Sequence, residues 1–279
     1  DVCSSDLDKA LDFAWHWPRV VARGGGEAFE LGEVSLAMDL QNRFLGTGTT
    51  EMKVGTLSAG FGSLEGLSVR SEAREEGDRL MMSVRPAVAK LVAAGQTLEA
   101  LALELNVKGL DTRSVETLTT TFSETCGLQA VTAAEGQRLR EATQTLLTRG
   151  FSAGIGQLSG KSADGAIDGQ WSVELTPARG GQIRLAEQLR SSGRLDLLGR
   201  LVPPEQRQLV LAMGAAVEQG NGLRASYEYA DGLLKVNGRT LDAGPFQQGL
   251  AAADSELSRQ LAAWQGGGVQ PAQIGRAHV

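Results

Sequence analysis

The sequence predicts an α+β fold built on one large, twisted and mainly antiparallel β-sheet with a few packed helices. Apolar and polar residues alternate in several successive segments, and side chains that alternate in this way point to opposite faces of a strand. Segments with a helical period interrupt the strands at only a few places. The chain also contains 36 glycines in 279 residues, which suits many tight turns between strands. We therefore expect an antiparallel sheet with one apolar, buried face.

The first half of the chain contains five alternating segments, and the fifth is the clearest. In it, apolar residues occupy every second position: Leu101, Leu103, Leu105 and Val107. We expect Pro86 to end the fourth segment, because proline has no N–H for the hydrogen-bond ladder. The five segments are Val34–Leu40, Thr50–Leu57, Leu67–Arg74, Asp78–Pro86 and Glu99–Asp111.

Two more alternating segments lie in the second half of the chain. The first covers Ala163–Pro177 and places Trp171 among its apolar residues. The second covers Gly222–Leu241 and contains Asp231-Gly232, a dipeptide favoured in two-residue hairpin turns. The sequence therefore predicts a hairpin here, in which Tyr227 and Tyr229 share one face.

Helix signals separate these strands. Thr132 and Glu135 form a capping box that begins a helix ending at Gly150. A second helix is expected from Pro203-Pro204 to Gly220, and a third over residues 247–268. The second helix has an apolar stripe of Leu209, Met213, Ala216 and Val217.

The N-terminal part is expected to be less regular. Residues 7–21 predict a short helix interrupted by Pro18, and the sequence RGGGE at Arg23–Glu27 predicts a flexible break. We therefore expect an N-terminal segment over residues 8–27, a domain over residues 28–265 and a tail over residues 266–273.

The two ends of the chain are expected to derive from a sequencing-library adaptor. One inverted DNA repeat can encode both Asp1–Asp6 and Ile274–Val279, and its next bases would supply Leu7. Residues 1–7 and 274–279 are therefore not expected to belong to the fold, and the chain is expected to be a gene fragment.

Setting these ends aside leaves Cys126 as the one cysteine and His16 as the one histidine. This excludes an intramolecular disulfide and a zinc site of the Cys/His type. Cys126 is expected to be a small buried or half-buried hydrophobe. The formal net charge is −6 and the sequence has no basic run, which argues against nucleic acid as a partner. The sequence also has no apolar run of the roughly 18 residues that a membrane-spanning helix needs.

Three stretches resemble a known family: YEYADGLLKVNGRTL, LALELNVKGLDTRSVETL and LLTRGFSAGIGQLSGKSADGAIDGQWSVEL. They are similar to the strand, turn and helix steps of the YdgA-like bacterial envelope proteins, a family of unknown function. The similarity covers Ala28 to Leu250. It implies a periplasmic domain tethered to the inner membrane by an N-terminal anchor that would lie before Asp1. It implies no catalytic residue and no cofactor.

Two motifs imitate catalytic or nucleotide-binding sites. GFSAG at Gly150–Gly154 matches the nucleophile elbow, but a helix is expected before Ser152 and strands after it, the reverse of what that chemistry needs. GIGQLSGKS at Gly154–Ser162 nearly matches a phosphate-binding loop, but the glycine spacing is wrong and a turn follows. We expect Lys161 to be a solvated residue near a hairpin tip.

Other polar residues also have structural interpretations. His16 between two tryptophans could stack on a ligand, but an edge position is expected; Asp111 could act as a general acid, but a helix N-cap role is expected. The acidic cluster Glu72, Glu75 and Glu76 is interpreted as a solvated turn or strand edge that discourages edge pairing. No catalytic, cofactor-binding or metal-binding residue is assigned.

The sequence thus favours a non-enzymatic envelope domain with a scaffolding or partner-binding role. The alternative is a carrier of lipid or another hydrophobic ligand, because a bent sheet can present an apolar trough. A third possibility, an enzyme with dispersed catalytic carboxylates, has no motif to support it. An envelope protein or a lipid is the expected partner, and a homo-oligomer is also considered.

Overall fold

The computed structural model describes residues 10–24, 27–60, 62–93, 95–124, 131–163, 165–197 and 202–263. Over these ranges, fifteen strands form one sheet in which every strand pair is antiparallel. The predicted α+β class with a large antiparallel sheet is confirmed. The expected adaptor segments, the expected tail over 266–273 and Cys126 lie outside the described residues.

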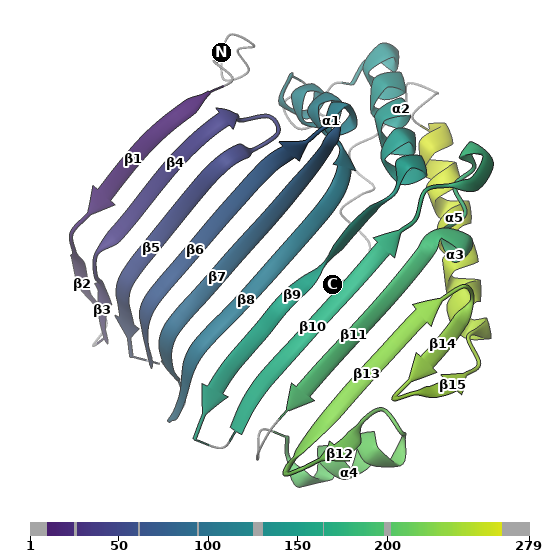
Figure 1. The fold of residues 1–279 in the computed structure, drawn as a ribbon. Coiled ribbons are helices and arrows are strands. Elements are labelled where there is room, and N and C mark those ends of the chain that lie inside the picture. Colours follow the sequence, from purple (N-terminus) through teal and green to yellow (C-terminus); the bar gives the residue numbers. More distant parts are fainter. Residues whose placement is uncertain are drawn as a thin grey trace.

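The strands lie side by side across the sheet (Figure 1). Their main order is β1-β4-β5-β6-β7-β8-β9-β10-β11-β13-β14-β15, with β2, β3 and β12 off this path. Their bounds are β1 (Leu11–Trp17), β2 (Val20–Gly24), β3 (Glu27–Leu31), β4 (Val34–Asn42), β5 (Thr47–Ala59), β6 (Gly62–Glu76), β7 (Arg79–Ala93), β8 (Gln96–Asp111), β9 (Phe151–Ser162), β10 (Gly165–Leu175), β11 (Leu189–Leu197), β12 (Val217–Gln219), β13 (Gly222–Ala230), β14 (Leu233–Val236) and β15 (Arg239–Leu241).

The helices gather at the ends and along one side of this sheet. In Figure 1, α1 and α2 stand at one end of the central strands, α3 and α5 lie beside the later strands, and α4 lies at the opposite end beside β12. Their bounds are α1 (Thr112–Glu124), α2 (Ala133–Arg149), α3 (Leu185–Gln188), α4 (Pro204–Ala212) and α5 (Gly244–Ala263).

The strand register gathers the apolar side chains on one face. Residues directly opposite each other in antiparallel strands share a face. One row of opposed residues crosses the sheet from β1 to β14: Phe13, Met38, Thr50, Ser71, Val84, Leu105, Ile155, Trp171, Gly193, Tyr227 and Val236. We call the face of this row the apolar face. The polar face, on the other side, carries residues such as Arg85, Glu104, Lys108, Ser152 and Arg194.

Only part of the apolar face is buried by the described residues. Near α1, Leu80 is fully buried in a cluster with Leu45 and Ala73, against which Val115 of α1 packs. In the middle of the sheet, by contrast, the apolar side chains stay open: Leu105 is 39%, Trp171 40% and Leu195 36% exposed. The predicted apolar face is therefore present, but within the described ranges it is not buried throughout.

The predicted N-terminal helix is wrong. Leu11–Trp17 forms strand β1, which pairs with β4 along its whole length. Leu11, Phe13, Trp15 and Trp17 alternate with polar or small residues, which is a strand period rather than a helical one. The expected flexible break is also wrong in its described part, because β2 and β3 pair as a hairpin with Gly24 opposite Glu27.

The predicted strand end at Pro86 is also wrong. Strand β7 continues to Ala93, and Pro86 lies opposite Val69 of β6. The pairing of β7 with β8 is interrupted beside the proline, and it resumes at Ala87 in the register that it had before. Arg85 bridges this interruption on the polar face, where its Nε donates to Glu104 Oε1 at 3.0 Å. The proline therefore interrupts the pairing with one neighbouring strand but does not end β7.

The helix predicted from Pro203 begins as expected but ends early. Helix α4 starts at Pro204 and ends at Ala212, because Gly214 follows with φ +70°, a conformation that stops a helix. The segment expected to complete the apolar stripe becomes β12. Leu209 and Met213 are 60% and 71% exposed and do not pack, whereas Ala216 is buried.

The other local predictions are confirmed. Helix α2 has the capping box, with Glu135 Oε2 accepting from Thr132 N at 2.7 Å, and Gly150 caps its C-terminus. Asp231 and Gly232 turn between β13 and β14 with φ of +51° and +77°. The third helix is present as α5 over its described residues.

Candidate functional site: a hollow on the apolar face

A hollow of about 340 Å³ lies on the apolar face over β9, β10, β11 and β13. Its lining is almost entirely carbon surface, since most of its side chains are aliphatic or aromatic. The apolar side chains that line it are Ile155, Leu158, Trp171, Leu195, Ala215, Ala225, Tyr227 and Val236.

Two glycines let side chains from neighbouring strands pack closely at this hollow. Gly193 lies between Trp171 on β10 and Tyr227 on β13, directly opposite both. A Cβ at Gly193 would come within 2.6 Å of Tyr227 Cε1 and 3.2 Å of Trp171 Cδ1, so the two rings occupy the space that a side chain would take. Gly169 lies opposite Leu195, and its Cβ would meet Leu195 Cδ1 at 3.1 Å.

The polar tips of the aromatic residues at the hollow satisfy one another. Trp171 Nε1 donates a hydrogen bond to Tyr227 Oη. Ser191 Oγ lies 2.9 Å from the same Tyr227 Oη and completes the chain. Because these groups already have partners, the hollow offers an occupant mainly apolar surface, with a polar group held at one side.

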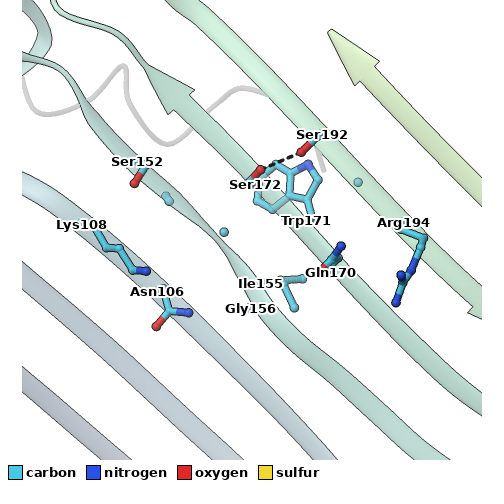
Figure 2. Close-up of a pocket in the computed structure, with 13 residues that line it drawn as sticks. Asn106, Lys108, Ser152, Ile155, Gly156, Gln170, Trp171, Ser172, Ser192 and Arg194 are labelled. Atoms are coloured by element: carbon cyan, nitrogen blue, oxygen red, sulfur yellow. Dashed lines mark hydrogen bonds between the residues drawn. The ribbon is translucent and has the colours of Figure 1, made fainter. Parts of the chain in front are cut away.

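A second hollow, of about 380 Å³, lies over neighbouring strands and is lined largely by side chains of the polar face. Figure 2 shows the hydrogen bond between Ser172 and Ser192, whose hydroxyl oxygens are 2.9 Å apart, and the cationic side chains Lys108 and Arg194. Arg194 is neutralised by Asp168 at 2.8 Å and Asp196 at 3.2 Å. This second hollow therefore combines hydroxyls with one paired cation and Lys108.

The structure separates Ser152 from the histidine that a hydrolase would need. Ser152 lies on β9 directly opposite Lys108 of β8, after α2 rather than after a strand. His16 lies on β1, and β4, β5, β6, β7 and β8 stand between it and β9. Within the described ranges, no imidazole base accompanies this serine. The expected edge position of His16 is confirmed.

Lys161 and two of the three residues of the acidic cluster lie beside turns, whereas Glu72 lies within β6 opposite Thr49 and Ser83. Lys161 is the penultimate residue of β9, opposite Ala166 across the β9–β10 hairpin, so no helix follows it. Glu75 and Glu76 end β6 beside the turn to β7, as the turn interpretation predicts. The edge interpretation of the cluster is wrong, because β6 lies between β5 and β7.

Asp111 is confirmed as the N-cap of α1. Its Oδ1 accepts from Ser114 N at 2.8 Å and from Ser114 Oγ at 2.6 Å, and its Oδ2 receives Arg149. Burial of this carboxylate disfavours its charge, but the bonds from Ser114 and the cation of Arg149 outweigh that effect and lower the pKa of Asp111. The Asp111 carboxylate thus has a structural role, as a helix cap and as the partner of Arg149.

The described residues contain no group of three or more His, Cys, Asp or Glu side chains that could hold a metal ion. Among the described helices, none has the length and apolar character needed to cross a bilayer.

Sequence reasoning missed the hollow itself. The alternation puts Trp171 and Tyr227 on apolar strand faces, but nothing local brings them together across Gly193. The available signal was a glycine inside a β-strand, which often marks a place where another group approaches closely. Gly169 and Gly193 are both of this kind.

Fold and hollows together define the class of protein: an α+β protein whose open antiparallel sheet carries an apolar hollow on one face and a polar hollow on the other. More particularly, the chain belongs to the DUF945 family of bacterial proteins of unknown function, whose sequence profile matches residues 3–198. The hairpin Gly222–Leu241, on which part of the resemblance rests, lies outside the matched residues. Comparisons with curated proteins and with solved structures found no match.

Proposed function

We propose that this protein is a non-enzymatic domain of the bacterial cell envelope that binds the acyl chain of a lipid in the hollow of its apolar face. The observation that carries the proposal is the almost wholly apolar lining of that 340 Å³ hollow. Ligand sites of about 300–1,000 Å³ are typically lined by apolar and aromatic side chains with a few placed polar groups. The hollow has this composition, and Tyr227, whose hydroxyl is bonded to Ser191 outside the lining, is one of its polar residues.

The surroundings of the hollow also favour an apolar occupant. Trp171 and Leu195 in its wall, and Leu105 on the same face, are more than a third exposed. Covering apolar surface contributes about 25 cal/mol per Å². An acyl chain lying along this face would bury these side chains without needing hydrogen bonds of its own. Large exposed apolar patches of this type mark binding surfaces in soluble domains.

A periplasmic location is proposed from the resemblance to the YdgA-like envelope proteins. In that family an N-terminal anchor tethers the domain to the inner membrane, which would place the hollow near a source of lipid. Fractionation of cells that express the complete gene tests this location. Recovery of the product in the cytosolic fraction would contradict it.

A scaffolding role is the second candidate, and the extent of the apolar face favours it. Exposed apolar side chains continue well beyond the hollow, as far as Trp15 and Trp17 on β1. A protein partner could cover this larger surface, whereas one acyl chain would not. The two candidates therefore differ in the ligand of the apolar face: an acyl chain in the first and a protein partner in the second.

Titration with a dansyl-labelled long-chain fatty acid tests the acyl-chain proposal. Leu195→Gln places an amide in the wall of the hollow, and we expect it to weaken binding about tenfold or more. Leu233→Gln is the matched control, because Leu233 is exposed and lies on the polar face beyond the hollow. This control should bind like the wild type. Equal weakening by both variants, or no saturable binding by the wild type, would overturn the proposal.

The position of the ligand can be tested separately. In a variant with Trp15, Trp17 and Trp264 replaced by phenylalanine, Trp171 is the remaining tryptophan. A fatty acid brominated along its chain should then quench the fluorescence of Trp171. Saturable binding without quenching would place the fatty acid elsewhere and leave the scaffolding role as the better candidate for the hollow.

A further inference from the structure

Strand β1 forms one edge of the sheet, and its exposed surface is strongly apolar. No described strand pairs with its outer side, which leaves a row of backbone N–H and C=O groups open. On the apolar face, Leu11, Phe13, Trp15 and Trp17 are 41–47% exposed although β4 lies beside them. Proteins usually protect such an edge with charges, bulges or a covering segment, and an apolar edge without these invites pairing with another strand.

We propose that β1 pairs antiparallel with β1 of a second copy of this chain, so that the two sheets join into one. A two-fold axis through Ala14 would place Leu11 opposite Trp17 of the second copy, Asp12 opposite His16, and Phe13 opposite Trp15. Each strand contributes the same pairs, as an isologous interface requires.

The sequence of β1 is complementary to itself in this register. On the apolar face, an aromatic residue meets an aromatic residue in the Phe13–Trp15 pairs, which is a favourable cross-strand combination. On the polar face, a carboxylate meets an imidazole in the Asp12–His16 pairs, which can hydrogen-bond whether or not the ring is charged. His16 Nε2 lies 3.8 Å from Glu33 Oε1, and its side chain is 52% exposed, so it is accessible from the open edge.

Other registers fit less well. A slip by one residue would set the apolar residues of one copy against the polar face of the other. A slip by two residues would bring in either Pro18, which has no N–H to donate, or residues before β1. The register centred on Ala14 is the one that pairs all of Leu11–Trp17 and keeps both faces continuous.

A cysteine placed on the two-fold axis tests this arrangement. In a background with Cys3→Ser and Cys126→Ser, Ala14→Cys would set its thiol opposite the same thiol of the second copy, within the reach of a disulfide. Ala37→Cys is the matched control: Ala37 is also an exposed alanine, and it lies directly opposite Ala14 on the same face of β4. In a dimer of the Ala37→Cys variant, the two thiols would be three strand spacings apart, about 14 Å, which is too far.

We expect the unmodified chain to form dimers in sedimentation experiments over about 1–200 μM, because a strand-edge interface is small and its affinity modest. Under mild oxidation the Ala14→Cys variant should give a disulfide-linked dimer, and the Ala37→Cys variant should not. A monomer across the whole range would overturn the proposal. Linkage that is as ready in the Ala37→Cys variant as in the Ala14→Cys variant, or that occurs in neither, would also overturn it.

Exchange of the charged residues provides an independent test of the proposed register. His16→Asp sets two carboxylates opposite each other across the interface and should weaken the dimer. The double variant Asp12→His with His16→Asp restores a carboxylate opposite an imidazole and should recover it. These side chains are exposed at an edge, so the melting of each variant shows whether the fold is intact. Failure of the double variant to recover the dimer, with its fold intact, would contradict the register.

Discussion

Arg149, in the last turn of α2, reaches the carboxylate of Asp111, which caps the first turn of α1. The same guanidinium also reaches Asp78 in the turn between β6 and β7. Next to it, Arg79 Nη1 donates to the carbonyl oxygens of Gly109 at 2.6 Å and Gly150 at 3.1 Å. The two arginines thus tie together the end of β8, the helices α1 and α2 and a turn of the sheet.

We expect Asp111→Ala to lower the free energy of unfolding by about 2–4 kcal/mol, because it removes a helix cap and leaves Arg149 without its buried partner. Asp111→Asn should cost less, because asparagine also caps helices but lacks the charge. Urea unfolding measures both values. Asp78→Asn is the control: its side chain is 67% exposed, and its effect should be small. Equal losses for all three variants would contradict this account.

The lowered pKa of Asp111 predicts how its contribution depends on pH. A carboxylate whose pKa is lower in the folded state stabilises the fold above its unfolded pKa, near 3.8 here, and loses that contribution as pH falls through the folded value. The stability difference between the wild type and Asp111→Asn should therefore be full at pH 6–7 and should shrink below about pH 4. Urea unfolding at several pH values measures it. A difference that grew on acidification would be inconsistent with the ion pair.

The hairpin turn predicts a strong dependence on Gly232. Its φ of +77° is strained for a β-branched residue, so Gly232→Val should destabilise the domain by about 1–2 kcal/mol or more. A Cβ there would also meet Gln247 Nε2 at 2.8 Å. Asp231→Asn is the control, because asparagine tolerates the same left-handed conformation. Thermal melting should show the loss in the main transition, and a wild-type melt for Gly232→Val would refute the prediction.

Tyr227 and Tyr229 share a face but should respond oppositely to loss of the hydroxyl. Tyr229 is buried, and its ring packs edge-on against Phe246 with the ring centroids 4.5 Å apart. Its hydroxyl has no hydrogen-bond partner among the described residues. Tyr229→Phe should therefore be neutral or stabilising by about 1 kcal/mol. Tyr227→Phe removes the partner of Trp171 and Ser191 and should destabilise by a similar amount. Destabilisation by Tyr229→Phe would mean that its hydroxyl is bonded after all.

Ser152 is expected to have no nucleophilic role. With p-nitrophenyl acetate, the wild type and Ser152→Ala should release product at the same background rate, because no imidazole base lies beside this serine in the described structure. The measurement is a stopped-flow trace at high protein concentration. A burst that depends on Ser152 would show that a base does reach it.

Features that depend on neighbours along the chain could be predicted from the sequence. The alternation of Leu101 to Val107 sets the faces of β8 because the strand period is local. The capping box at Thr132 and the turn at Asp231-Gly232 are likewise decided within a few residues. The N-cap role of Asp111 follows for the same reason.

The errors arose where two signals competed. Pro86 would end an isolated strand, but strands on both sides hold β7 in register across it. Leu11–Trp17 alternates as a strand and has β4 to pair with, although the segment also permitted a helical interpretation. For α4, Gly214 and Gly220 are both possible stops in the sequence, and the chain uses the earlier one.

By itself, then, the sequence determined the fold class, the existence of an apolar sheet face and most of its turns, because these follow from side-chain period and backbone conformation. Only the tertiary structure decided which strands are neighbours. That choice places Gly193 between Trp171 and Tyr227 so that their rings can meet, brings Arg149 to Asp111, and leaves β1 at the edge. Contacts between residues far apart in the chain depend on the register of the whole sheet, which no single segment encodes.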